Sequence, residues 1–129
     1  MKLIVSGSRT ITDYELVSVL IDNYAAKARE LNERLIIIHG NALGVDECAD
    51  RYAKEHGCGL IVMPALWKFH GIKAGILRNI DMAELVGATH CLCIWDGVSK
   101  GTKEMDKIAR KRGLDTFLLA YNQWQNHPK

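Results

Sequence analysis

Short apolar runs alternate with longer amphipathic runs along the chain. The apolar runs cover residues 3–6, 35–39, 59–63, 90–95 and 116–120, and each is mostly apolar rather than alternating. Uniformly apolar strands are typical of a sheet that is covered on both faces, and their alternation with helices is typical of parallel sheets. The pattern therefore predicts five parallel strands.

The amphipathic runs predict four helices, at about 12–32, 45–56, 73–86 and 102–112. In the first, apolar side chains recur every four residues from Leu16 to Ala28, and Thr12 and Glu15 have the spacing of a capping box. The other three end just before glycines at positions 57, 87 and 113, where a left-handed C-cap is natural. A glycine directly after each of these three runs supports its assignment as a helix.

Five strands with intervening helices predict an α/β fold, a Rossmann-like three-layer sandwich with a five-stranded parallel sheet in the order 3-2-1-4-5. Right-handed crossovers between parallel strands favour this arrangement. A length of 129 residues is typical of one domain, so we expect one domain over residues 1–129. In this strand order the chain reverses direction between strands 1 and 4, and ligands bind at such a switch point, outside the carboxyl ends of the strands.

Composition narrows the functional classes only slightly. With 17 Lys and Arg against 15 Asp and Glu, the net charge of +2 predicts no polyanion-binding surface. The apolar runs are shorter than the roughly 20 residues of a membrane helix, and Met1 leads directly into a strand, so we expect a cytoplasmic protein without a signal peptide or membrane contact. The four cysteines lack zinc-site spacing, so we expect buried, reduced thiols, no metal and no cofactor.

Two of the loops that follow predicted strands are candidate anion sites. After strand 1, Gly7 permits a tight turn beside Ser8 and Arg9, which is either an anion cradle or a turn whose arginine faces solvent. After strand 2, Gly40 and Gly44 bracket a turn into a helix, where free backbone N–H groups can face a phosphate. This turn lacks the Walker lysine and the dinucleotide-binding spacing. Asp46 lies in the first helical turn, as a dipole-stabilising cap or as a ligand.

The loop after strand 4, residues 96–104, carries the strongest local signal. It combines two glycines, two hydroxyl groups and two lysines at a helix N-terminus. We expect Thr102 to cap the helix and to bind an anion. Glu104 follows within the helix, and a carboxylate beside a phosphate site is favourable only if it faces a cationic group, such as the oxocarbenium-like sugar of a breaking glycosidic bond.

The connection at residues 64–75 is long and aromatic, as functional loops often are. Trp67, Phe69 or His70 would either stack on a base or lie in a subunit interface. In the helix that follows, Arg78 lies at the edge of an apolar face or points into a cleft. This helix is more apolar than one sheet-facing stripe requires, so we expect a homodimer or larger homo-oligomer.

Taken in order, these motifs resemble the YspA-related branch of the SLOG superfamily. These are Rossmann-like nucleotide-binding proteins related to the Lonely Guy phosphoribohydrolases and, more distantly, to the DNA-processing protein DprA. The resemblance rests on Gly7-Ser8-Arg9, the run from Gly40 to Asp46, Pro64-Ala65 with Trp67 and His70-Gly71, Arg78-Asn79 with Met82, and Trp95-Asp96-Gly97 with Ser99 and Gly101-Thr102.

The resemblance implies a ligand class and a reaction. Lonely Guy enzymes release the base from a nucleoside 5′-monophosphate, and the matching positions are Gly101 and Thr102 for the phosphate loop, with Arg78 and Glu104 at the scissile bond. The chain departs from those enzymes at residues 96–99, where they have Pro-Gly-Gly. It also departs at Met105, where they have a second glutamate.

Sequence and resemblance together predict that the chain binds a nucleotide or a nucleotide-derived ligand, with hydrolysis of the N-glycosidic bond as its possible reaction. A non-catalytic sensor or sponge for a nucleotide signal is the alternative. Single-stranded nucleic acid is a disfavoured partner, because the cations of the last helix have the spacing of a solvated face. The expected ligand-contacting residues are Gly7, Ser8, Arg9, Gly40, Gly44, Asp46, Asn79, Asp96, Gly97, Ser99, Gly101 and Thr102.

Overall fold

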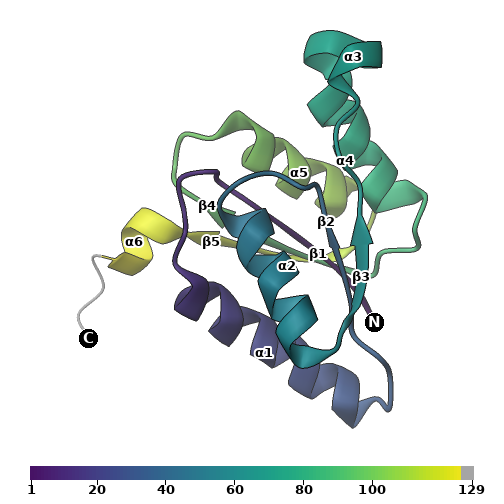
Figure 1. The fold of residues 1–129 in the computed structure, drawn as a ribbon, viewed down its shortest axis with the longest axis vertical. Helices are drawn as coiled ribbons and strands as arrows, with labels where there is room; N and C mark the ends of the chain where they lie inside the picture. The colour runs from purple at the N-terminus through teal and green to yellow at the C-terminus, as the bar shows by residue number, and fades with distance from the viewer. Residues whose placement is uncertain (126–129) are drawn as a thin grey trace.

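The computed structural model describes the backbone of residues 1–125 and the side chains of residues 1–123. Five strands form one parallel sheet in the order β3-β2-β1-β4-β5 (Figure 1). This confirms the predicted α/β Rossmann-like fold and its strand order. The strands are β1 (Lys2–Gly7), β2 (Ile36–His39), β3 (Gly59–Val62), β4 (His90–Trp95) and β5 (Asp115–Ala120).

Helices cover both faces of the sheet (Figure 1). Helices α1 (Tyr14–Glu30) and α2 (Val45–His56) lie on one face, and α4 (Ala74–Glu84) and α5 (Lys100–Lys111) lie on the other. Two short elements, α3 (Trp67–His70) and the 3-10 turn η1 (Gly71–Lys73), precede α4, and α6 (Tyr121–Gln125) follows β5. No helix among residues 1–125 is long and apolar enough to cross a membrane.

The central strands divide their side chains between two cores. Leu3 and Val5 of β1 pack with α1 and α2, whereas Ile4 packs with Met82 of α4 and Met105 of α5. Because successive side chains of a strand point to opposite faces, a strand covered on both sides must be apolar at every position. The four cysteines are free; three are buried, and Cys58 is partly buried.

Two helix starts differ from the sequence prediction. The Asp13 carboxylate accepts the Leu16 N–H at 3.1 Å, so Asp13 rather than Thr12 is the N-cap of α1. Helix α5 begins at Lys100, two residues before the predicted start, and Ser99 is its N-cap. Thr102 is therefore the third residue of α5 and does not cap it, which corrects the expectation for that residue. Composition alone does not locate the first residue of either helix. The Asp13 side chain fixes the start of α1, and the backbone turn that ends at Ser99 precedes α5.

Candidate functional site

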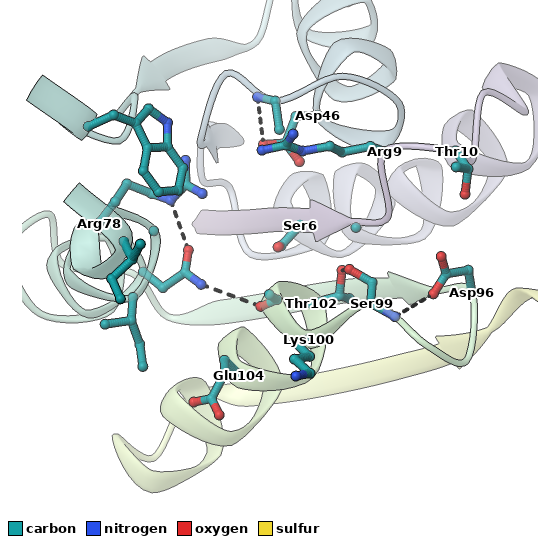
Figure 2. Close-up of a pocket in the computed structure, with 18 residues that line it drawn as sticks. Ser6, Arg9, Thr10, Asp46, Arg78, Asp96, Ser99, Lys100, Thr102 and Glu104 are labelled. Carbon is teal, nitrogen blue, oxygen red and sulfur yellow. Dashed lines mark hydrogen bonds between the residues drawn. The ribbon is translucent and has the colours of Figure 1, made fainter.

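A pocket of about 440 Å³ opens at the carboxyl edge of the sheet, beside the N-terminus of α5 and against α4 (Figure 2). Figure 2 shows Arg9 and Asp46 on one side of the pocket and Lys100 and Glu104 on the other. Three loops far apart in sequence meet here because their strands are parallel and adjacent. The candidate site residues that line the pocket are Gly7, Arg9, Asp46, Trp67, Arg78, Asn79, Asp96, Ser99, Gly101, Thr102 and Glu104.

The other candidates lie behind or beside this pocket. Ser8 is buried, and its hydroxyl accepts the Asp96 N–H at 3.0 Å, so it ties the β1 loop to the β4 loop. Gly40 lines an adjoining cavity of about 220 Å³. Gly44, Gly97 and His70 line neither space. Direct ligand contact by these last three residues is therefore not supported by the cavity geometry.

The β4–α5 loop, residues 96–102, leaves backbone N–H groups unpaired at the pocket. The Asp96 carboxylate accepts the N–H groups of Val98 and Ser99 at 2.9 and 2.8 Å. Burial opposes ionisation of Asp96, but these two hydrogen bonds, with further contributions from Ser8 and from the N–H of Asp96 itself, outweigh it, and its pKa lies below the usual value. The described part of the chain gives no hydrogen-bond acceptor to the N–H groups of residues 100–102. Such a helix end is suited to bind an anion.

Gly101 keeps the surface above these N–H groups open. A Cβ atom built on Gly101 would meet no heavy atom within 4 Å, and the residue lines the pocket. Glycine inside a helix costs about 0.5–1 kcal/mol relative to alanine, so packing alone does not account for its presence. Close approach of a ligand to the backbone would account for it.

In the β2–α2 loop, residues 40–44, the N–H groups of residues 40–42 are bonded within the protein. The Asp46 carboxylate accepts the N–H of Gly40 at 3.0 Å and that of Ala42 at 3.3 Å, and Asn41 donates its N–H to His39 Nδ1 at 2.9 Å. Burial raises the pKa of Asp46, and the two N–H groups oppose part of that rise. A phosphate here would have to displace these bonds and approach a buried carboxylate. Asp46 was expected to be either a dipole-stabilising cap or a ligand-binding residue. The structure favours a role within the protein, because its carboxylate accepts the protein's own N–H groups.

Arg78 and Asn79 connect these two loops. Arg78 Nη1 donates to the Gly40 carbonyl at 2.6 Å, and Arg78 Nε donates to Asn79 Oδ1 at 2.9 Å. Asn79 Nδ2 in turn donates to the Gly101 carbonyl at 3.4 Å. A Cβ atom on Gly40 would lie 2.1 Å from Arg78 Nη1, so any other residue there would displace the guanidinium. Burial lowers the pKa of Arg78; the charge of Asp46 opposes this shift, and the charge of Arg9 adds to it.

Three charged side chains at the pocket have no hydrogen bond or ion pair among the described residues: Arg9, Lys100 and Glu104. An exposed arginine beside unpaired N–H groups favours an anionic ligand group. From the sequence, Lys100 counted only as one of the two lysines of the loop after strand 4. The lining is completed by Ser6, Thr10, Ala42, Ile72, Gly75 and Ile76, and none of these residues, Lys100 included, was among the expected ligand-contacting residues.

Trp67 lies where the two cavities adjoin, because it lines both together with Arg9, Ala42 and Arg78. Its side chain is about half exposed (52%), so its ring is available to a ligand or to a second protein. Among the residues that the structure describes, no group of three or more His, Cys, Asp or Glu side chains is arranged to hold a metal ion.

Comparison with known proteins places this geometry in a family. The model of the YspA, cpYpsA-related SLOG family matches residues 1–70, which include the loops after β1 and β2. The Gene 61 protein of Mycobacterium phage D29 is 37% identical over 123 residues, covering 88% of this chain and 91% of the phage protein. No solved structure matches the chain. With a family model matching more than half of its length, the chain belongs to the YspA, cpYpsA-related SLOG family.

Proposed function

We propose that the protein binds a nucleotide or nucleotide-derived ligand whose phosphate lies on the N-terminus of α5. The observation that carries this proposal is the set of unpaired N–H groups at residues 100–102 beneath the open face of Gly101. Arg9 and Lys100, which have no partner in the described residues, supply positive charge at the same pocket. The family membership supports the same class of ligand.

The rest of the pocket suits a nucleoside. Trp67 and Ile76 provide apolar surface at some distance in sequence from the phosphate loop, and both line the pocket. A base stacked on an indole ring gains about 1–3 kcal/mol without sequence-specific hydrogen bonds. A cavity of about 440 Å³ lies within the range that holds small ligands.

Calorimetric titration with AMP, adenosine and inorganic phosphate tests this proposal. We expect AMP to bind more tightly than adenosine, and Arg9→Gln to weaken AMP binding about tenfold while leaving adenosine unaffected. Lys107→Gln is the control for the loss of one positive charge, because Lys107 is exposed on α5 and does not line the pocket. Equal affinity for AMP and adenosine would contradict a phosphate site.

Hydrolysis of the N-glycosidic bond of a nucleoside 5′-monophosphate is the second candidate function. Its support is Glu104, which lines the pocket and forms no hydrogen bond or ion pair with the described residues. A free carboxylate there can stabilise an oxocarbenium-like sugar and orient water. Arg78, already bonded to Gly40 and Asn79, would position the sugar or Glu104.

Base release from nucleoside monophosphates decides between enzyme and binder. If the chain is a hydrolase, Glu104→Gln should bind AMP nearly as well as the wild type and release base about a hundred- to a thousandfold more slowly. Binding without base release by the wild-type protein would instead identify a non-catalytic sensor or sponge.

We also propose that the protein self-associates through an apolar arm, residues 66–72. Figure 1 shows α3 projecting from the body of the molecule, and Leu66, Trp67, Phe69 and Ile72 are exposed by 51, 52, 79 and 96%. Large apolar side chains exposed together in one short segment are typical of a protein–protein contact surface. A second copy would cover this surface with the same surface of its own.

Light scattering tests the association. We expect a mass of at least two chains for the wild type and of one chain for the Phe69→Ser, Ile72→Ser double variant. Asp115→Ser, an exposed change on β5, is a control that should leave the mass unchanged. A wild-type mass of one chain would contradict the proposal.

Nucleic acid remains a disfavoured partner, because much of the positive charge on and beside α5 is already engaged. Arg110 pairs with Asp106, Arg112 pairs with Glu84, and Lys103 lies over the ring of Trp95. We expect no binding of single-stranded DNA in a fluorescence-anisotropy titration at physiological salt. The cytoplasmic location stays a prediction.

A further inference from the structure

His39, the last residue of β2, is a buried titratable side chain outside the pocket of about 440 Å³. It is 1% exposed, and both of its ring nitrogens are engaged. Nε2 lies 2.8 Å from Asp50 Oδ2, and Nδ1 lies 2.9 Å from the N–H of Asn41. A buried polar ring held on both sides fixes the backbone to which it is bonded.

These two contacts assign the tautomer. The Asn41 N–H can only donate, so Nδ1 must be the acceptor and Nε2 must carry the hydrogen that is donated to Asp50. Asp50 also binds Lys54 Nζ at 2.7 Å, and that hydrogen bond, together with His39, holds the pKa of Asp50 below its usual value. Asp46, in the first turn of α2, is a further charged group near the ring, and Glu47, Arg51 and Glu55 line a cavity together with His39 and Asp50.

The backbone that His39 fixes is the one that binds Arg78. Asn41 has a left-handed backbone (φ 60°), which costs a non-glycine residue about 1 kcal/mol and persists only where neighbouring groups impose it. The preceding residue, Gly40, presents its carbonyl to Arg78 Nη1 at 2.6 Å. Hydrogen bonds therefore run without a break from Asp50 through His39 and the 40–41 turn to the guanidinium at the pocket.

We propose that His39, oriented by Asp50, is a positioning residue that sets the direction of Arg78 in the pocket through the Gly40–Asn41 turn. It touches no ligand itself. The expected effect of His39 on ligand affinity rests on the proposed nucleotide site. The effect of His39 on the position of Arg78 can be tested without any ligand. Asp46 fixes the N–H groups on either side of Asn41, so His39 supplies the one remaining bond that this turn requires.

Two isosteric variants separate the two ring nitrogens. In His39→Asn the side-chain oxygen takes the place of Nδ1 and can still accept the Asn41 N–H, whereas the bond to Asp50 is lost. In His39→Gln the side-chain amide takes the place of Nε2 and can still bind Asp50, whereas the acceptor for Asn41 is lost. Both variants remove the ring, but asparagine is one methylene shorter than glutamine and leaves the larger cavity. A purely packing role would therefore make His39→Asn the more damaging change, opposite to the order expected here.

The first readout uses the ligand-free protein. Nitrogen-15 NMR of the wild type should show an unprotonated Nδ1 and a protonated Nε2, and His39→Gln should shift the Asn41 amide and the Arg78 Nε–H resonances while His39→Asn should not. The opposite tautomer in the wild type would overturn the proposal even if neither variant folds. Unchanged Arg78 resonances in a folded His39→Gln protein would also overturn it.

The second readout is AMP affinity. We expect His39→Gln to weaken AMP binding about tenfold, the effect of one ordinary hydrogen bond, and His39→Asn to remain within about threefold of the wild type. Equal losses in both variants would overturn the positioning role. Absence of AMP binding by the wild type would instead contradict the nucleotide site, and the ligand-free spectra would still decide whether His39 positions Arg78.

Discussion

The β2–α2 and β4–α5 loops look alike in sequence and differ in what they do with their backbone. Each follows a parallel strand, contains two glycines and leads into a helix. In each case an aspartate accepts two N–H groups: Asp46 from the first turn of α2, and Asp96 from within the β4–α5 loop. In the β2–α2 loop the N–H groups of residues 40–42 are bonded to Asp46 and His39. In the β4–α5 loop Asp96 binds the N–H groups before the helix, and those of residues 100–102 stay unpaired in the described structure.

The difference shows that an anion site is defined by unpaired donors rather than by a glycine pattern. Buried backbone N–H groups find a partner, so the useful question is where each one is satisfied. In the β2–α2 loop the partners are His39 and Asp46, and the loop serves to hold Arg78. In the β4–α5 loop a ligand would be the missing partner.

Gly44→Ala should have the largest effect on stability. Gly44 has a φ of 75° and a ψ of −119°, and a Cβ atom there would lie 2.5 Å from the carbonyl oxygens of Ser8 and Arg9. Backbone atoms cannot move aside as a flexible side chain can, so we expect a loss of about 3 kcal/mol or more in the free energy of unfolding. Urea denaturation measures it; a loss below about 1 kcal/mol would show that the β2–α2 loop is not constrained as described.

Asp46→Ala should cost about 2–3 kcal/mol of stability, because it leaves the buried N–H of Gly40 and the partly buried N–H of Ala42 without an acceptor. Asp96→Ala is the matched variant in the other loop and should cost about 1 kcal/mol or less, since Val98 is exposed and water can replace the carboxylate. Both values come from urea denaturation. Similar losses in the free energy of unfolding for Asp46→Ala and Asp96→Ala would contradict the difference between the two loops.

Gly101→Ala should raise stability by about 0.5–1 kcal/mol, because alanine favours the helix and its methyl group meets no neighbour within 4 Å. The same change should weaken AMP binding, since the methyl group would lie between the ligand and the N–H groups. Thermal unfolding and calorimetric titration measure the two effects. A stabilised variant with unchanged AMP affinity would place the phosphate elsewhere.

The smallest predicted effect is an opposite pH dependence of the two aspartates. The lowered pKa of Asp96 makes its contribution to stability present above about pH 4 and lost as the pH falls through the folded pKa. The raised pKa of Asp46 makes its contribution largest at low pH and smaller as the pH rises through the folded value. Unfolding of Asp96→Asn and Asp46→Asn across the acid range should therefore give differences from the wild type that change with opposite sign.

The apolar runs sufficed to predict the sheet, because strands covered on both faces are apolar at every position and parallel crossovers permit few orders. The sequence also indicated the carboxyl edge of the sheet as the site. It did not indicate α3, whose four residues are all exposed and show no buried face. Nor could it indicate which loop keeps free N–H groups, since that depends on the orientation of individual side chains such as His39 and Asp96.

The most direct test of the account is an NMR titration of the nitrogen-15-labelled protein with AMP, following the backbone amides of both loops. If the phosphate binds at the N-terminus of α5, the amides of Lys100, Gly101 and Thr102 should show the largest downfield proton shifts, because they gain a charged acceptor. The amides of residues 40–42 should change much less, since their bonds to Asp46 and His39 remain. Dominant shifts at residues 40–42, with the α5 amides unmoved, would contradict the account.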